Sequence, residues 1–363
     1  MRPRARDAGV WFGELPTGPK NAITDIAGVK VGHCTIVKGS GPLIPGKGPV
    51  RTGVTAILPH DGNMFGRPVK ASYFDLNGCG GLGGSLQIRE FGLIDTPIVL
   101  TNTMSMGTAS TAVVKYMLER NPSSGITEDT IIPIVSECDD SWLNDSRGLH
   151  VHEEHVIEAI EKASSEVSEG AIGGGTGMSS YDFKGGIGTS SRIVSTPAGK
   201  FTVGTMVMSN HGEWQELRID GVPVGSILGS PEQQRPEKGS IVMVVATDAP
   251  LDSRQLGRIA RRATLGLAVT GSASHNGSGD IVISFSTANT HDRFNGNGLL
   301  TDHLLRDSEI DPLFRATVDS TAEAIINSLF KAETVEGRDG HIVRALPIER
   351  TLELLEEHGR LIR

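Results

Sequence analysis

Short runs of apolar residues recur along the chain, separated by polar segments rich in glycine, proline and serine. Runs of this length, rich in valine and isoleucine and bounded by turn residues, are typical of buried β-strands. The pattern predicts strands at 27–37, 53–59, 97–102, 131–136, 240–250 and 280–287. The segments 201–210 and 217–225 are predicted to be two further strands that pair with each other.

Helical periodicity marks several segments between these strands. Residues 151–167 form an amphipathic pattern, with apolar residues spaced as on one helix face. The segment 252–269 is predicted to be a helix with Asp252 as its N-cap. Helices are also predicted at 108–120, 309–332 and 347–358, the last with Pro347 in its first turn. Strands and helices therefore mix along the whole chain, as in α/β proteins.

Length and charge narrow the class of protein. At about 150 residues per domain, 363 residues suggest two domains or one large one. A chain of this size buries enough surface to need no disulfide or structural metal. The net charge of −9 argues against nucleic acid as the main partner, because nucleic-acid binding needs a basic face. With 46 glycines, the chain is expected to expose backbone in tight turns.

The three cysteines, Cys34, Cys79 and Cys138, lie far apart in the sequence. An odd count without paired spacing argues against a disulfide framework and against a cysteine-based zinc site. The N-terminus has positive charge but no apolar run of secretory-signal length, and no segment is apolar over the roughly 20 residues of a membrane span. We therefore expect a cytoplasmic protein with no membrane partner.

Two motifs are compatible with a binding function, but neither is specific enough to establish it. Residues 78–83 spell G-x-G-x-x-G, but the next predicted strand ends at Asn102 and not at the acidic residue of a dinucleotide fingerprint. Nucleotide binding by this loop stays open as an alternative to tight-turn packing. His150, His152 and His155 cluster beside two glutamates, yet their spacing matches no zinc-protease pattern, and a solvated helix start explains them equally well. No G-x-S-x-G elbow is present, and nothing in the sequence selects a hydrolase triad.

The junction between Gly239 and Ser240 differs from the other Gly-Ser pairs. It alone joins a charged loop, 230–239, directly to a strongly apolar strand. A glycine tolerates strained backbone angles, so the serine hydroxyl could attack the preceding carbonyl and break the chain. The product would be a serine with a free α-amine, whose pKa near 7.7–8.0 suits a general base. Nucleophile and base would then belong to one residue, Ser240, although an ordinary loop-to-strand connection is the simpler reading of the spacing.

Six blocks of sequence resemble one known family. They are 16–33, 101–107, 143–145, 183–192, 239–251 and 277–287, and they occur in family order over most of the chain. The chain resembles the DmpA/BapA family of L-aminopeptidase/D-alanine esterase-amidases and β-aminopeptidases, which mature by self-cleavage. The resemblance implies a four-layer α-β-β-α sandwich, similar to N-terminal-nucleophile hydrolases but with different connectivity. It also implies one structural domain, 1–363, divided by self-cleavage into chains 1–239 and 240–363.

The resemblance assigns roles to particular residues. Ser240 matches the nucleophile, and cleavage is expected between Gly239 and Ser240. Ser278 and Asp280 match a serine and acid pair that orients the new α-amine, although the family's aminopeptidases often have glutamate in place of the aspartate. Asn210 matches an asparagine that donates to the oxyanion, and Glu137 an acid near the amino end of the substrate. Taken without the family, Asn210 could equally cap a turn and Asp280 could form an Asx turn.

Some residues depart from the family pattern. Gly81 and Gly83 occupy a loop that commonly carries an acid and a threonine, and Cys138, Asp139 and Asp140 follow Glu137 where no family tyrosine can be placed. The resemblance implies no cofactor, no metal and a homo-oligomer, commonly a tetramer or octamer. Expected substrates are small peptides, amides or esters with D-alanyl, L-aminoacyl or β-aminoacyl groups. A nucleotide-binding protein and an uncleaved, non-catalytic family member remain the alternatives.

Overall fold

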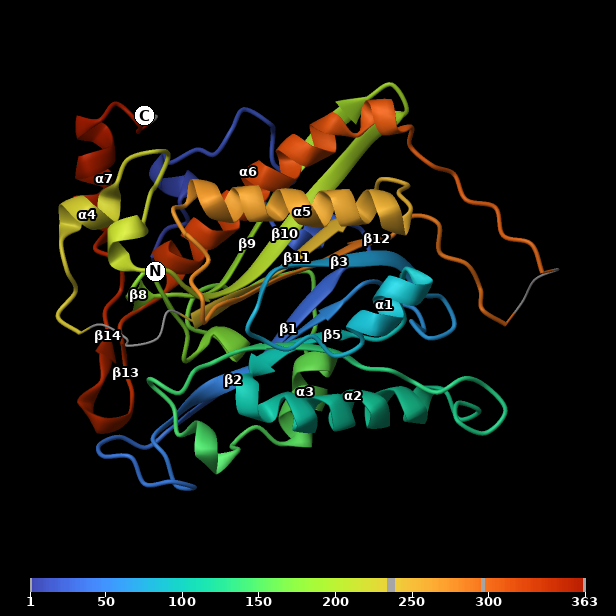
Figure 1. The fold of residues 1–363 in the computed structure, drawn as a ribbon, viewed down its shortest axis with the longest axis horizontal. Coiled ribbons are helices and arrows are strands. Elements are labelled where there is room, and N and C mark those ends of the chain that lie inside the picture. Colours follow the sequence, from blue (N-terminus) through green and yellow to red (C-terminus); the bar gives the residue numbers. More distant parts are fainter. Residues whose placement is uncertain (1, 234–238, 295–297, 362–363) are drawn as a thin grey trace.

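Two β-sheets lie face to face at the centre of the computed structural model, which describes residues 2–233, 239–294 and 298–361 (Figure 1). The four-stranded sheet has the order β1-β2-β5-β6, with β1 Lys30–Lys38, β2 Val50–Leu58, β5 Ile98–Asn102 and β6 Ile134–Cys138. The six-stranded sheet has the order β4-β3-β12-β11-β10-β9, with β3 Val69–Gly78, β4 Leu93–Ile94, β9 Gly186–Thr196, β10 Gly199–His211, β11 Gly239–Thr247 and β12 Gly279–Ser286. Two small hairpins consist of β7 Ser179–Ser180 with β8 Phe183–Lys184 and β13 Val335–Glu336 with β14 Ile342–Val343.

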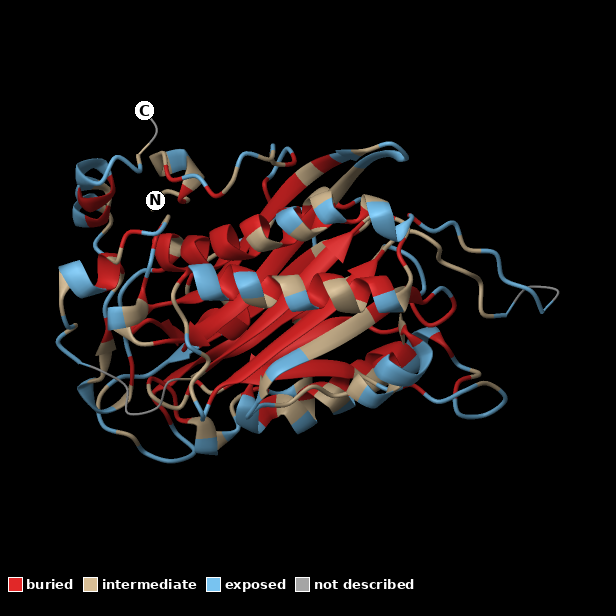
Figure 2. Cartoon of the chain, turned by 45° about the horizontal axis from the view of Figure 1, so that its top comes forward, coloured by how far each residue is buried: buried red, intermediate tan, exposed pale blue. Residues whose placement is uncertain are grey.

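Helices cover the outer face of each sheet. Helices α5 and α6 pack on the six-stranded sheet, and α2 and α3 pack on the four-stranded sheet (Figure 1). The helices are α1 Ser85–Phe91, α2 Met106–Arg120, α3 Glu153–Glu161, α4 Val224–Leu228, α5 Ser253–Val269, α6 Asp311–Lys331 and α7 Ile348–Glu357. Figure 2 shows most strands of the two sheets and the inward faces of these helices as buried, whereas β3 is largely intermediate or exposed. The arrangement confirms the expected α-β-β-α sandwich.

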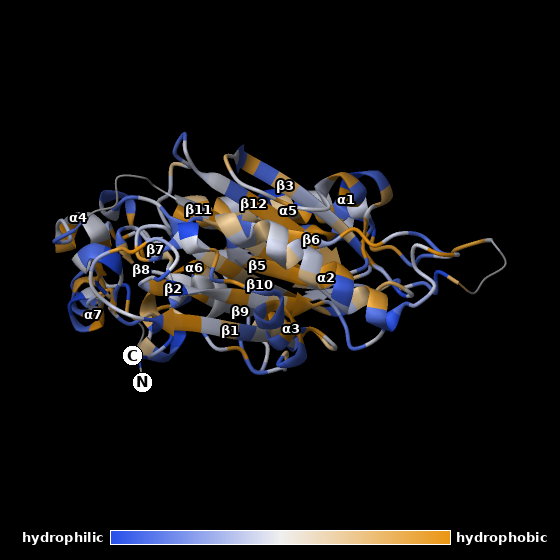
Figure 3. Ribbon diagram, turned by 90° about the horizontal axis from the view of Figure 1, so that it is seen from below, coloured by the Kyte–Doolittle hydropathy of each residue, from blue (hydrophilic) through white to orange (hydrophobic). Residues whose placement is uncertain are grey.

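Strand β11 is apolar on both faces because both faces are covered. Ile241, Met243 and Val245 pack in the core beneath α5 and α6. The alternate residues Val242 and Val244 pack in a second core between the two sheets. Figure 3 shows the hydrophobic residues gathered along the strands. Since successive side chains of a strand point to opposite faces, this alternation places Ser240 on the face toward the four-stranded sheet.

Most predicted elements are present with shifted ends. Asp252 caps α5 as expected, because its Oδ1 accepts from the Gln255 amide at 2.7 Å. The helix predicted at 151–167 ends at Glu161, because the chain then leaves it to form paired hydrogen bonds between Ser164 and Val31. The part of the predicted exposed loop at 234–238 lies outside the described residues.

The predicted pairing of 201–210 with 217–225 is wrong. Strand β10 has β9 on one side and β11 on the other, so neither of its edges is open to a further strand. Residues 217–225 instead contain one isolated bridge, between Ile219 and Val222, and the start of α4. Strand β9 was not predicted from the sequence, because its glycine- and serine-rich composition is not typical of a strand. Gly188 shows why that composition is needed, because a Cβ there would lie 2.0 Å from a backbone oxygen of α6.

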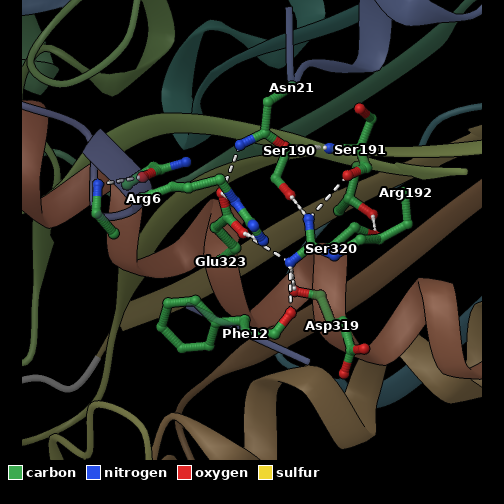
Figure 4. A network of polar contacts seen from close by, with 12 residues as sticks. Arg6, Phe12, Asn21, Ser190, Ser191, Arg192, Asp319, Ser320 and Glu323 are labelled. Atoms are coloured by element: carbon green, nitrogen blue, oxygen red, sulfur yellow. Dashed lines mark hydrogen bonds and ion pairs between the residues drawn. The ribbon is translucent and has the colours of Figure 1, made fainter. Parts of the chain in front are cut away.

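A buried ion pair ties β9 to α6 (Figure 4). Arg192 Nη2 lies 2.6 Å from Glu323 Oε2, and both side chains are fully buried. Arg6 and Asn21 also donate to the Glu323 carboxylate, so the N-terminal segment joins the same network. The Arg192 guanidinium also donates to the backbone carbonyl of Phe12 at 2.7 Å. The network thus fixes the N-terminal segment against both a strand and a helix.

Candidate active site

The ends of three neighbouring strands bring the predicted site residues together. In the antiparallel pairing of β10 with β11, Asn210 lies opposite Ser240. In the parallel pairing of β11 with β12, Ile241 lies opposite Asp280, which places Gly279 beside Ser240. Residues far apart in the sequence therefore meet at one end of the six-stranded sheet.

Ser240 is placed directly after a glycine in the left-handed region. Gly239 has φ +63°, a conformation that a residue with a Cβ adopts only with strain. The Ser240 side chain is largely buried, and its Oγ accepts a hydrogen bond from the Gly279 amide at 2.9 Å. The hydroxyl is therefore held in place next to the peptide bond that precedes it.

Residues 277–280, which read Gly-Ser-Gly-Asp, have a steric reason for the glycine at position 279. A Cβ at Gly279 would lie 2.5 Å from the carbonyl oxygen of Cys79, so only glycine fits between that backbone and Ser240. On either side of it, the Ser278 hydroxyl donates to Asp280 Oδ2 at 2.9 Å. Asn77 Nδ2 donates in turn to Ser278 Oγ at 3.0 Å. Asn77 thus fixes the serine of the pair, and no local pattern predicts this contact because the two residues are 201 positions apart.

Asp280 is a buried carboxylate with one oxygen unused. Among the described residues its Oδ1 has no hydrogen-bond partner, although the side chain is fully buried. Burial raises the pKa of the carboxyl, and hydrogen bonds from Ser274 and Ser278 oppose that shift. Because buried polar atoms are normally paired, Asp280 Oδ1 is able to accept one further hydrogen bond.

Asn210 has a fixed orientation. Its Oδ1 accepts from the Ser179 amide at 2.8 Å, and its Nδ2 donates to the Asp139 carbonyl oxygen at 2.8 Å. The side chain therefore does not cap a turn of its own strand, which was the alternative explanation for it. It joins β10 to the loop that follows β6 on the opposite sheet.

A cavity of about 800 Å³ opens at this junction. Gly239 and Ser240 line it on the six-stranded sheet, and Glu137 lines it from β6. The Glu137 carboxylate accepts from the Gly81 amide at 2.7 Å and from the Thr103 hydroxyl. Burial raises the pKa of Glu137, whereas these two hydrogen bonds act to lower it. An acidic group and the serine hydroxyl therefore share one small cavity.

The residues that depart from the family pattern have structural uses. Gly81 supplies the amide that binds Glu137, and Gly83 donates to the Val135 carbonyl oxygen at 2.8 Å. Both carboxylate oxygens of Asp139 accept from Ser141, one from its amide and one from its hydroxyl. Several other residues of the cavity wall were not predicted from the sequence, including Thr103, Met104, Met106, Trp142 and Arg338.

The loop at 78–83 does not have the surroundings of a dinucleotide site. The helix after it, α1, leads to β4, which pairs antiparallel with β3, whereas the dinucleotide motif requires a parallel βαβ unit. The Gly81 amide is already bonded to a carboxylate, whose charge would repel a phosphate. The G-x-G-x-x-G sequence of this loop is therefore not part of a dinucleotide-binding motif.

The histidines near α3 are engaged in local contacts. His150 Nε2 lies 2.9 Å from Asp145 Oδ2, and His155 Nδ1 accepts from the His152 amide at 2.9 Å. Over the ranges that the structure describes, no group of three or more His, Cys, Asp or Glu side chains could hold a metal ion. The surface-helix interpretation of this cluster therefore accounts for its contacts.

Fold and cavity together define an α/β-sandwich hydrolase with a serine at the start of a central strand. The chain belongs to peptidase family S58, whose model matches residues 21–343. This confirms the family suggested by the sequence blocks, and with it the prediction of a hydrolase of the aminopeptidase class.

Curated relatives and solved structures agree with this assignment. Beta-peptidyl aminopeptidase BapA of Sphingosinicella microcystinivorans is 41% identical, over 99% of this chain and 93% of its own. A crystal structure from Pyrococcus horikoshii is 51% identical with a TM-score of 0.94, covering 99% of this chain and 100% of that one. The L-aminopeptidase D-Ala-esterase/amidase of Ochrobactrum anthropi is 41% identical with a TM-score of 0.93, over 99% of this chain and 100% of its own. It is described as a prototype of the serine aminopeptidases and a new variant of the Ntn hydrolase fold, in agreement with the fold class expected from the sequence.

In the described part of the chain, no helix combines the length and the apolar character needed to cross a bilayer.

Proposed function

We propose that this protein is a self-processing serine aminopeptidase that is cleaved between Gly239 and Ser240. The two products, 1–239 and 240–363, would remain together in one structural domain. The observation that carries the proposal is the left-handed Gly239 directly before Ser240, whose Oγ is held by the Gly279 amide beside the cavity. A cytoplasmic location and a homo-oligomeric state of four or eight copies are part of the same proposal.

Self-cleavage proceeds by an acyl shift. Ser240 Oγ attacks the carbonyl carbon of Gly239, the C–N bond breaks, and the former amide nitrogen takes a proton as the Ser240 α-amine. Water then hydrolyses the ester, which leaves a carboxylate on Gly239 and a free hydroxyl on Ser240. The Asp280 carboxylate, with its unpaired Oδ1, would accept from the new ammonium group.

Turnover uses the same hydroxyl. Ser240 Oγ attacks the substrate acyl carbon while the α-amine of Ser240 takes the proton, and the amine then protonates the leaving group. Asn210 would donate a side-chain amide hydrogen to the oxyanion, a contribution typically worth about 3–4 kcal/mol. Water clears the acyl-enzyme by the reverse route, with no cofactor or metal required.

The substrate class follows from the cavity and from the relatives. Glu137 provides a negative charge for the substrate's ammonium group inside a cavity of about 800 Å³. A cavity of this size suits small peptides, amides or esters. The relatives are named for β-peptidyl, L-aminoacyl and D-alanyl substrates, and we extend that range to this chain without a preference among them.

Intact mass and N-terminal sequencing test the cleavage. The purified protein should separate into fragments of about 25 and about 13 kDa, which divide the 38.5 kDa chain in the ratio of their lengths. By Edman degradation, the N-terminal sequence of the smaller fragment should be Ser-Ile-Val-Met. An intact chain that hydrolyses aminoacyl substrates would overturn the mechanism, and an intact, inactive chain would indicate the non-catalytic alternative.

Asp280→Asn tests the role of the carboxylate through pH dependence. A nearby negative charge favours the ammonium form and so raises the pKa of the α-amine, by about 1–3 units at 4–6 Å. The variant should therefore move the ascending limb of kcat/KM to lower pH by about one unit or more, and should also lower the maximal rate. The measurement is a pH profile of kcat/KM, which reports the free enzyme, on one aminoacyl p-nitroanilide.

Asp252→Asn is the matched control for this experiment. It removes one carboxylate charge from the N-cap of α5, where asparagine caps equally well, and should leave the limb in place. An unmoved or alkaline-shifted limb in Asp280→Asn would show that Asp280 does not neighbour the amine, even if cleavage occurs at Gly239.

A further inference from the structure

One cation lines the cavity that holds Ser240. Among the described residues of the cavity wall, Arg338 is the only lysine, arginine or histidine, whereas Glu137 and Asp139 supply the acids. Arg338 follows the short strand β13 and comes from a part of the chain to which the proposed mechanism assigns no role.

The Arg338 side chain is anchored at two of its three nitrogens. Its Nε donates to the Ser141 carbonyl oxygen at 2.7 Å, and its Nη1 donates to Asp339 Oδ2 at 2.9 Å. Among the described residues its Nη2 has no hydrogen-bond partner. The side chain is 24% exposed, so it is fixed in direction but still open to a ligand.

The backbone around Arg338 holds it against the same wall. The Arg338 amide donates to the Leu143 carbonyl oxygen at 3.1 Å. The neighbouring His341 stacks on Trp142, with ring centroids 3.7 Å apart, and shares a hydrogen bond with the Trp142 carbonyl oxygen. Trp142 and Ser141 themselves line the cavity, so the guanidinium belongs to a built wall and not to a loose surface side chain.

Glu137 and Arg338 reach the cavity at different points along β6 and the loop that follows it. Glu137 comes first, the Asp139 carbonyl is bonded to Asn210, and the Ser141 carbonyl is bonded to Arg338. A dipeptide spans at most about 7 Å between its termini. Because Glu137, Ser240 and Arg338 all line the same cavity, a short substrate bound at Ser240 has a carboxylate near for its amino end and a guanidinium near for its carboxyl end.

We infer that Arg338 forms a carboxylate-binding subsite, so that the preferred substrates are dipeptides with a free C-terminal carboxylate. A guanidinium presents planar paired donors that match a carboxylate, and such charge-assisted bonds are stronger than neutral ones. The Asp339 carboxylate offsets part of the charge, but partly exposed ion pairs of this kind are weak and leave Nη2 available. This inference rests on the proposed function, because it assumes that the scissile carbonyl lies at Ser240.

Three substrates that share one N-terminal residue test the subsite. They are a dipeptide, the same dipeptide as its C-terminal amide, and the aminoacyl p-nitroanilide, with the N-terminal residue chosen as the one hydrolysed fastest from a p-nitroanilide set. The wild-type enzyme should favour the dipeptide over its amide about tenfold in kcat/KM. That preference should fall as ionic strength rises, since salt screens partly exposed charges.

Arg338→Met should remove the preference. The KM for the dipeptide should rise about tenfold, while kcat/KM for the amide and the p-nitroanilide should stay within about twofold. Arg338→Lys keeps the charge but not the paired donors, so its KM for the dipeptide should lie between those of the wild type and Arg338→Met. Arg350→Met removes an exposed arginine of α7 and should match the wild type on all three substrates.

Several results would overturn the proposal that Arg338 binds the substrate carboxylate. These are equal wild-type rates on the dipeptide and its amide, a preference that does not respond to salt, or equal losses on all three substrates in Arg338→Met. If Arg338→Met fails to fold, the wild-type salt series and Arg338→Lys decide the matter. A wild-type protein that hydrolyses no p-nitroanilide would instead overturn the proposed function, and the subsite with it.

Discussion

The Ser240→Ala variant should remain a single chain of 38.5 kDa and lose at least about four orders of magnitude in kcat/KM. The effect is large because one hydroxyl has two tasks. Without it, the Gly239 carbonyl is not attacked, so no α-amine forms, and no nucleophile remains for the substrate. Intact mass and hydrolysis of an aminoacyl p-nitroanilide measure the two losses separately.

Two further variants test whether the loss is specific to the Ser240 hydroxyl. Ser240→Cys should still cleave, since a thiol is the better nucleophile. Ser40→Ala is the matched control, because Ser40 also follows a left-handed glycine, Gly39 at φ +67°, but lies exposed in a loop. It should cleave and turn over as the wild type does. Turnover by Ser240→Ala would mean that another residue is the nucleophile.

Glu323→Ala should destabilise the folded protein by about 3–5 kcal/mol, the usual cost of leaving a buried charge without its partner. Arg192 is fully buried, and Glu323 is the carboxylate that neutralises it. Arg6 and Asn21 would lose their bonds to the same carboxylate (Figure 4). Denaturant unfolding followed by circular dichroism measures the change in the free energy of unfolding.

The double variant Arg192→Met/Glu323→Leu distinguishes a lost charge partner from lost packing. It removes both charges, so it should be less destabilised than Glu323→Ala. Glu353→Ala, which breaks the exposed pair with Arg350, should change stability by less than about 1 kcal/mol. If Glu323→Ala costs no more than Glu353→Ala, the buried pair is not what holds the N-terminal segment.

The same pair also predicts a pH dependence of stability. Burial alone would raise the pKa of Glu323, but the charges of Arg192 and Arg6 and their hydrogen bonds hold it below its usual value. A lowered folded-state pKa stabilises the fold above the unfolded pKa, near 4.3, and this contribution is lost as the pH falls through the folded pKa. The difference between wild type and Glu323→Ala should therefore shrink below about pH 4.

The local pattern of apolar residues was enough to predict strands whose two faces are both buried. The apolar run at 240–250 becomes β11 because helices cover one face and the second sheet covers the other. Asp252 becomes an N-cap because its side chain satisfies an amide only three residues away. Interactions of this kind are close in sequence, so composition and spacing are sufficient to predict them.

The same pattern did not predict elements correctly where the packing partner is distant in the sequence. The composition of β9 did not predict a strand, because Gly188 is required by the close approach of α6 and not by any neighbour in sequence. The segment 217–225 has alternation typical of a strand, yet β10 had no free edge to pair with it. A strand needs an available partner, and the sequence does not display which edges are occupied.

The sequence alone determined the family, the glycine–serine junction at 239–240 and the residues proposed to act there, because each is a local string of residue types. Only the tertiary structure placed Asn210 opposite Ser240 and Gly279 beside it, since strand register joins residues about 30 and 40 positions apart. It also brought Glu137 and Arg338 to one cavity from opposite halves of the chain. The physical reason is that a cavity is built from side chains of several elements, and their meeting depends on how two sheets pack.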